Sequence, residues 1–264
     1  MDDRCPPGSS CMEGTCCPDV DAAPPADAPS QDAEPGPDGA APACPDDMVS
    51  VDNLYCIDRH EASRPNATET NGGDDDSRAT SREGVIPWSR EGVIPWYPVT
   101  LEVARNACIC AGKRLCGPDE ITTACQGPDQ TIYSYGDEFD PVICNSIDTY
   151  CRCGAGQTCE GISPCPYAHC YNQPPEGQSE PPGGCGAFPH AMPTGSFPDC
   201  TNEYGLFDIN GNVWELVDDG STYGHFRAGA YNCIDSERLH KCDFAATSIS
   251  AKGFRCCRDA AGGD

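Results

Sequence analysis

The chain has 264 residues, of which 22 are cysteines, and its formal net charge at pH 7 is −26. This negative charge argues against nucleic acid and anionic membranes as partners, because both would repel the protein. So many thiols would be reactive or would need metals in a reducing cytosol, yet no two of them have the CxxC spacing of a zinc ribbon or thioredoxin. We therefore expect an oxidised, disulfide-stapled protein in the periplasm, on the cell surface or secreted. Solubility explains the charge, and Ca²⁺ affinity is a compatible second interpretation.

The sequence shows neither an export signal nor a membrane span. It opens with MDDR, without the basic and apolar regions of a signal peptide, and contains no apolar run of membrane-spanning length. We expect that a leader was removed or that the true start lies upstream. A lipid anchor on an upstream cysteine is a further route of attachment.

The composition divides the chain into three parts. Residues 1–17 hold a small cysteine cluster that is expected to close one or two bridges. Residues 18–43 consist mainly of Pro, Ala, Asp and Gly with almost nothing apolar to bury, which is typical of a disordered acidic linker. Residues 44–264 are expected to form the folded domain.

The octapeptide SREGVIPW occurs twice in tandem, at residues 81–88 and 89–96. Solenoid architectures need longer periods and at least three repeats. We interpret the repeat as a local duplication tolerated in a surface loop, with a functional use of Trp88 and Trp96 as the alternative.

Two helices are predicted in the next segment. Thr100 is a suitable N-cap for a helix with one apolar face, and Gly112 ends it. Pro118 begins a second, short helix that ends near Gly127.

Cysteine spacing also carries predictions. Closely spaced cysteines are expected to bond to different partners: Cys16 and Cys17, Cys108 and Cys110, Cys151 and Cys153, Cys256 and Cys257. Residues 144–200 hold eight cysteines, many Gly and Pro, and no periodicity, which indicates a cysteine-rich insertion in the domain. Strand-like pieces lie around 204–207, 213–217 and 253–255, so we predict an irregular α+β fold that is low in regular secondary structure.

Five motifs occur in a fixed order: PVTLEVARNACICAGKRLC (98–116), YSYGDEFDPVICN (133–145), TGSFPDCTNEYGLFDINGNVWELVDD (194–219), FRAGAYNC (226–233) and GFRCC (253–257). This series resembles the formylglycine-generating enzyme, or sulfatase-modifying-factor, family from about Met48 to Arg258, apart from the insertion. GLFDINGNVWEL is close to that family's GLYDMxGNVWEW. The resemblance implies a C-type-lectin-like fold, low in regular structure and often calcium-bound.

The resemblance also implies a calcium site. In the family, an Asn after the YxxG segment and the Asn and Glu of GNVWE are ligands, which here correspond to Asn145, Asn212 and Glu215. The carbonyl of Val213 would be a companion ligand. Alternatively, Asn210 and Asn212 simply adopt turn conformations that Glu215 caps.

The family's enzymes oxidise a sulfatase cysteine with O₂ and copper(I), which two cysteine thiolates hold in the pattern RGGS-aromatic-x-C-x4-C. Residues 227–233 match this pattern through Cys233, although Ala230 replaces its serine. The second position is Arg238, which cannot bind copper. The next cysteine, Cys242, comes four residues late, and a structural Cys233–Cys242 bridge is the simpler expectation.

Two functions from different classes follow. The favoured one is an extracytoplasmic, catalytically degenerate module that binds an unknown protein or surface ligand or has a structural role, and that contains no free thiols. The alternative is a copper-dependent oxidase that acts on a sulfatase through a Cys233/Cys242 thiol pair. The disulfide partners of these two cysteines discriminate between them. The EPN and QPD tripeptides of calcium-dependent sugar sites are absent, so carbohydrate binding is not predicted.

Overall fold

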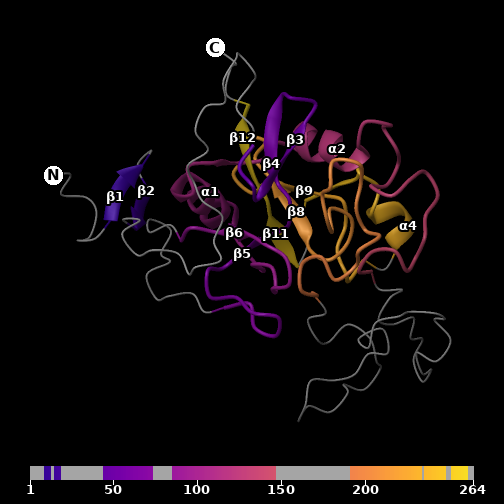
Figure 1. The fold of residues 1–264 in the computed structure, drawn as a ribbon, viewed down its shortest axis with the longest axis horizontal. Coiled ribbons are helices and arrows are strands. Elements are labelled where there is room, and N and C mark those ends of the chain that lie inside the picture. Colours follow the sequence, from indigo (N-terminus) through magenta and orange to yellow (C-terminus); the bar gives the residue numbers. More distant parts are fainter. Residues whose placement is uncertain are drawn as a thin grey trace, which may run out of the picture.

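A computed structural model describes residues 9–12, 15–18, 44–73, 85–146, 191–233, 235–247 and 251–260. Short strands and helices are joined by long irregular connections (Figure 1), which confirms the predicted α+β class. In chain order the elements are β1 (Ser9–Met12), β2 (Thr15–Pro18), β3 (Met48–Val51), β4 (Tyr55–Asp58), β5 (Ala62–Ser63), β6 (Trp88–Ser89), α1 (Leu101–Cys110), β7 (Arg114–Leu115), α2 (Pro118–Gln126), β8 (Trp214–Val217), β9 (His225–Arg227), α4 (Ser236–Leu239), β10 (Ala245–Ala246), β11 (Lys252–Phe254) and β12 (Cys256–Asp259).

Two four-stranded sheets organise the core. One has the order β3-β4-β12-β7 with antiparallel pairs throughout. The other has the order β10-β9-β8-β11, in which β11 pairs with β8 in parallel. Because Arg255 alone separates β11 from β12, the chain passes from one sheet to the other at this residue. Figure 1 shows β8, β9 and β11 near the middle of the molecule, beside β4 and β12.

The two predicted helices are confirmed. The Thr100 side chain accepts a hydrogen bond from the Val103 backbone N–H at 3.3 Å, as an N-cap does, and Gly112 follows α1 with a φ of +66°. Helix α2 begins at Pro118 and ends before Gly127. None of the helices in the described part of the chain is long and apolar enough to cross a bilayer.

The strand predictions are confirmed in part. Strands β8 and β11 form where the sequence predicts them. Residues 204–207 are not a strand, because their only ladder contact is an isolated bridge between Thr201 and Phe207.

Disulfides connect elements that are distant in sequence. Cys108 and Cys110 have different partners, as do Cys256 and Cys257, which confirms the prediction for these two pairs. The side chain of Cys16 and the pair Cys151/Cys153 lie outside the described residues. The bridges between described residues are Cys17–Cys110, Cys44–Cys56, Cys108–Cys256, Cys116–Cys257, Cys125–Cys242 and Cys144–Cys200.

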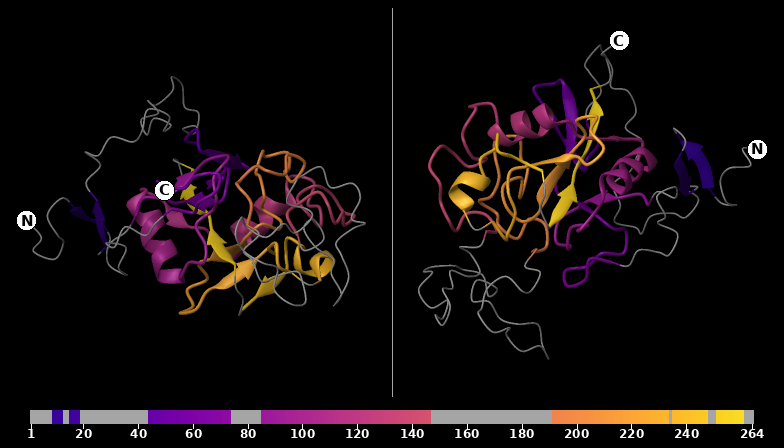
Figure 2. Two further views of the ribbon diagram at one scale, coloured as in Figure 1. Left: turned by 90° about the horizontal axis from the view of Figure 1, so that it is seen from below. Right: turned by 180° about the vertical axis from the view of Figure 1, so that it is seen from behind.

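The N-terminal cysteine cluster is attached to the main domain. Strands β1 and β2 form an antiparallel hairpin, and Cys17 of β2 is bonded to Cys110 of α1. Figures 1 and 2 show the hairpin beside α1. The linker predicted at 18–43 lies outside the described residues apart from Pro18. The same holds for residues 147–190 of the insertion, whose ends the Cys144–Cys200 bridge joins.

The second octapeptide copy is a core segment, so the surface-loop interpretation is wrong for it. Trp96 is only 2% exposed and packs edge-on against Phe254, with ring centroids 5.8 Å apart. Its backbone N–H donates to the Ala62 carbonyl at 2.8 Å. Trp88 of the first copy lies in β6, is half-buried and is covered by the Arg90 guanidinium. The two identical strings therefore have different environments.

Candidate functional site

The residues implied as calcium ligands are all buried near the start of β8. Asn145 and Asn212 lie side by side: the Asn145 side chain donates to Asn212 Oδ1 at 2.9 Å, and the Asn212 backbone N–H donates to the Asn145 carbonyl at 2.9 Å. The intervening backbone is tight, since a Cβ at Gly211 would lie 2.3 Å from the Asn145 carbonyl oxygen. The structure therefore brings two of the predicted residues together.

A carboxylate that the sequence analysis missed, Glu61, completes this turn. Its two oxygens accept hydrogen bonds from the Asn212 side chain at 2.5 Å and from the Val213 backbone N–H at 3.0 Å. Asn212 has a φ of +46°, a left-handed conformation that Asn tolerates better than most residues. Asn212 thus adopts the conformation of the turn interpretation, while its cap is Glu61 rather than Glu215.

Glu215 is engaged elsewhere. The Arg255 guanidinium donates to Glu215 Oε1 at 2.6 Å, and both side chains are fully buried. Arg255 also donates to the carbonyls of Asp58 and Arg59, which fixes it between the two sheets. The second oxygen of Glu215, Oε2, is buried without a hydrogen-bond partner among the described residues.

This arrangement does not fit a calcium ion. Calcium takes six to eight oxygen ligands, whereas the Asn212 amide oxygen is already used by the Asn145 side chain and the Met192 backbone N–H. Both oxygens of Glu61 and one of Glu215 also accept protein hydrogen bonds. No group of three or more His, Cys, Asp or Glu side chains within the described ranges could hold a metal. Calcium binding stays a prediction from the resemblance.

The buried charges around Arg255 do not balance. Three buried carboxyls, those of Glu61, Asp208 and Glu215, interact with this single guanidinium. Burial, the dominant cause, and the neighbouring carboxylates raise the pKa of Glu61 well above its usual range. Burial likewise raises the pKa of Asp208 to about 7. Protonation of these carboxyls relieves the excess negative charge.

Cys233, which matches the first copper-binding position, is a buried thiol. It is 3% exposed, accepts a hydrogen bond from the Ala230 backbone N–H at 3.2 Å and forms no disulfide with another described residue. Burial raises the pKa of the Cys233 thiol to about 12. At neutral pH the group is a thiol rather than the thiolate that binds metals.

Cys242 is not available to Cys233, so the expected Cys233–Cys242 bridge is wrong. Cys242 is bonded to Cys125 of α2, with an S–S distance of 2.02 Å. The cause is a tertiary contact: the backbone N–H of Cys242 donates to the Ile132 carbonyl, which holds this segment, just after α4, against the loop that follows α2. The structure therefore does not present the predicted thiol pair, and Cys233 contradicts the expectation of no free thiols.

Arg238 occupies the second copper position on the exposed side of α4. Its guanidinium donates to Asp235 at 2.7 Å and stacks over the Phe244 ring at 5.1 Å. A guanidinium has no lone pair to offer a metal. With one protonated thiol, one bridged cysteine and one arginine, the site does not fit a copper ion held by two thiolates.

Glu61 and Asp208 carry much of the buried charge, and sequence reasoning did not single them out. Asp208 has a φ of +55°, and its carboxylate accepts a hydrogen bond from the Gly195 backbone N–H at 2.6 Å. Asp208 lies within the GLFDINGNVWEL motif, so a closer examination of that motif could have found it. Glu61 is 151 residues from Asn212, and no spacing rule connects them.

Comparisons with known proteins show which family and which solved structures the domain resembles. The chain matches the family model described as "Sulfatase-modifying factor enzyme 1-like domain" over residues 56–260. It resembles the solved structure of PvdO from Pseudomonas aeruginosa, with 18% identity, coverage of 78% of this chain and 80% of that one, and a TM-score of 0.41. It also resembles the crystal structure of CarF, with 15% identity, coverage of 78% of this chain and 86% of that one, and a TM-score of 0.42. A third similar structure is Treponema denticola variable protein 1, with 12% identity, coverage of 82% of this chain and 92% of that one, and a TM-score of 0.42. No curated protein matches the chain significantly.

Proposed function

Because the chain belongs to the family of sulfatase-modifying factor enzyme 1-like domains, we propose that it is an extracytoplasmic, catalytically degenerate member that serves as a binding module. The family match confirms the resemblance that the motifs predict. The observation that carries the proposal is the Cys125–Cys242 disulfide, which removes the cysteine nearest in sequence to the missing ligand position.

The chemistry of the site supports the loss of oxidation. A copper(I) oxidase of this type needs two thiolates that converge on one ion. Cys233 is the one position that retains a thiol, and its raised pKa keeps it protonated at neutral pH. Arg238 supplies a positive charge where a second anionic ligand would be needed.

The disulfides support the extracytoplasmic location. Five of the six bridges between described residues span more than 50 positions, and all of them lie in or beside secondary-structure elements or at the ends of the insertion. These bridges join α1 to β12, the segment before α2 to β12, and α2 to the segment after α4. Disulfides of this kind persist in oxidising compartments. The fold depends on a compartment in which they can form.

Copper(I) titration tests the proposal. After mild reduction, the protein is expected to bind no stoichiometric copper(I) and to consume no O₂ with a cysteine-containing sulfatase peptide. The control is Cys233→Ala, which removes the remaining candidate ligand. Copper uptake and O₂ consumption by the wild type that both disappear in Cys233→Ala would overturn the proposal in favour of a variant oxidase.

A further inference from the structure

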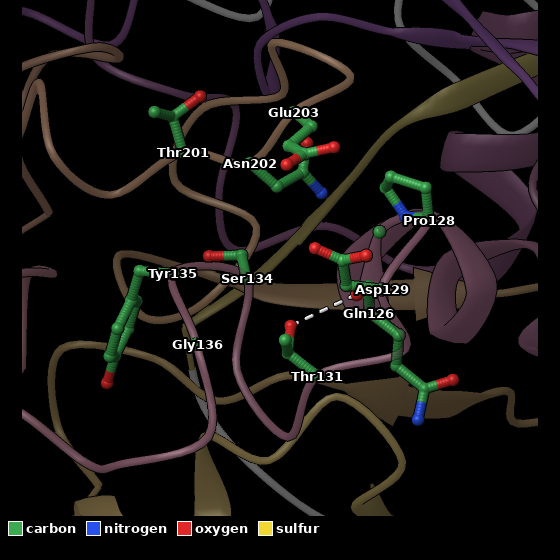
Figure 3. Close-up of a pocket in the computed structure, with 11 residues that line it drawn as sticks. Gln126, Pro128, Asp129, Thr131, Ser134, Tyr135, Gly136, Thr201, Asn202 and Glu203 are labelled. Atoms are coloured by element: carbon green, nitrogen blue, oxygen red, sulfur yellow. Dashed lines mark hydrogen bonds between the residues drawn. The ribbon is translucent and has the colours of Figure 1, made fainter.

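A pocket of about 450 Å³ lies apart from the family's copper position. Its walls are the end of α2 with the following turn, Thr131, residues 134–136, and residues 201–203 (Figure 3). Ligand pockets in proteins have volumes of about 300–1,000 Å³, so the size suits a small molecule or one side chain of a partner.

Two hydroxyl groups in the pocket wall have no hydrogen-bond partner among the described residues: Ser134 Oγ and Thr201 Oγ1. Ser134 is 6% exposed, and its backbone N–H donates to Asn210 Oδ1 at 2.7 Å, which fixes its position. An unpartnered buried hydroxyl costs about 1–3 kcal/mol. A bound ligand that makes these two hydrogen bonds would recover that free energy.

Two further polar side chains of the wall, those of Thr131 and Asn202, are hydrogen-bonded to the protein itself, so this part of the pocket is preformed. The Thr131 hydroxyl donates to the Gln126 carbonyl at 3.1 Å, the bond drawn in Figure 3. The Asn202 side chain donates to the Ala124 carbonyl at 2.6 Å and accepts from the Tyr204 backbone N–H. These bonds hold α2 and the loop at 201–203 together without help from a ligand.

The charge of the pocket selects its ligand. None of the lining residues is basic, and two of them, Asp129 and Glu203, are exposed carboxylates. No hydrogen bond or ion pair within the described residues engages either carboxylate. Figure 3 shows both acids on one side of the pocket, Tyr135 on the other side, and Ser134 between them. Anionic ligands such as phosphates and sulfates would be repelled here.

We propose that this pocket binds a guanidinium group. A guanidinium offers five N–H donors in a plane, which suits two carboxylates and two hydroxyl acceptors, and its face can stack on an aromatic ring. Tyr135, whose ring stacks on Tyr133 at 5.4 Å between centroids, is the aromatic residue that lines the pocket. The inference rests on the proposed binding role and names the chemistry that the module recognises.

Calorimetric titration with N-acetyl-L-argininamide at physiological salt tests the proposal. We expect saturable one-to-one binding, at least ten-fold weaker binding of N-acetyl-L-citrullinamide, which is uncharged, and weaker binding of the lysine analogue. Free L-arginine distinguishes the source of the guanidinium. Tighter binding of argininamide identifies an arginine side chain of a peptide, and tighter binding of free arginine identifies the amino acid.

The variants separate the pocket from the general attraction of an acidic protein. Glu203→Gln and Ser134→Ala are expected to weaken argininamide binding by about three- to ten-fold each. Glu69→Gln removes the same charge from an exposed loop elsewhere and should leave binding unchanged. Equal binding of citrullinamide, or equal weakening by Glu203→Gln and Glu69→Gln, would overturn the proposal. Copper uptake is measured separately, so failure of one proposal leaves the other intact.

Discussion

At the scale of single residues, the unbalanced charge around Arg255 affects the stability of the domain. Arg255 and Glu215 are fully buried, and such pairs are weak evidence for stability although breaking them is strongly destabilising. Glu61 and Asp208 add two carboxyls that a single guanidinium cannot neutralise. Their raised pKa values make the stability of the domain depend on pH.

Asp208 provides the test of this dependence. Its pKa in the folded protein is about 7, against 3.8 for an unperturbed Asp, so the folded state binds the proton more tightly. Its contribution to stability is fully present below pH 3.8 and is lost as the pH rises through 7. Asp208→Asn removes this loss and keeps an oxygen for the Gly195 N–H. The unfolding free energy of the variant relative to wild type, from urea titrations, should therefore increase between pH 5 and pH 8.

The control for this measurement is Asp199→Asn, an exposed carboxyl nearby in the same segment. This variant removes the same charge from the protein surface and so controls for the change in net charge. If the two variants show the same pH dependence, Asp208 does not titrate as the structure indicates.

At the scale of elements, the Cys125–Cys242 bridge joins α2 to the segment after α4 across 117 positions. The bridge Cys116–Cys257 lies just outside it in sequence, so with that bridge intact the path closed by Cys125–Cys242 contains only about two dozen residues. Each nested bridge therefore restricts the unfolded chain less when the other is present than it would alone.

This nesting predicts how the bridges contribute to stability. Replacing Cys125 and Cys242 by Ala should lower the unfolding free energy by about 3 kcal/mol with Cys116–Cys257 intact, and by only slightly more without it, because Cys108–Cys256 then closes a path of about thirty residues. Chemical denaturation of the two double variants and the quadruple variant measures both values. A loss that is larger by about 1 kcal/mol or more without Cys116–Cys257 would show that Cys108–Cys256 does not constrain this path.

The sequence predicts local elements well because their signals are local. Thr100 and Pro118 mark the starts of α1 and α2, and both helices begin as predicted. The motifs also place Asn145 and Asn212 in one site. The partner of Cys242 could not be predicted, because cysteine spacing does not define connectivity and the Ile132 contact that orients Cys242 is a product of the tertiary fold. The role of Glu61 could not be predicted for the same reason, because its contacts with Asn212 and Val213 arise only in the tertiary fold.

At the scale of the whole molecule, the fold is a set of irregular connections held by two small sheets and covalent bridges. The hairpin of β1 and β2 extends this scheme to the N-terminal segment through Cys17–Cys110. The pocket lined by Ser134 and the position that the resemblance assigns to copper share this frame: Asn210 donates to the His240 carbonyl after α4 and accepts from Ser134 in the pocket wall.

The octapeptide repeat leads to a prediction at the same scale. Because the two copies are identical and adjacent, removing either one gives the same polypeptide, which still has one SREGVIPW for the core. We expect this shortened chain to fold and to be less destabilised than Trp96→Ala, for which a loss of about 3–5 kcal/mol is expected. Thermal unfolding compares the two. A shortened chain that is as unstable as Trp96→Ala would show that Trp88 cannot take the place of Trp96.

On this prediction, Trp88 can take the place of the buried Trp96 in the core. A gene that encodes two adjacent copies of a core segment can lose one copy by slippage during replication and still encode one complete SREGVIPW segment. On this prediction, the chain before α1 can lose eight residues while a tryptophan still packs against Phe254.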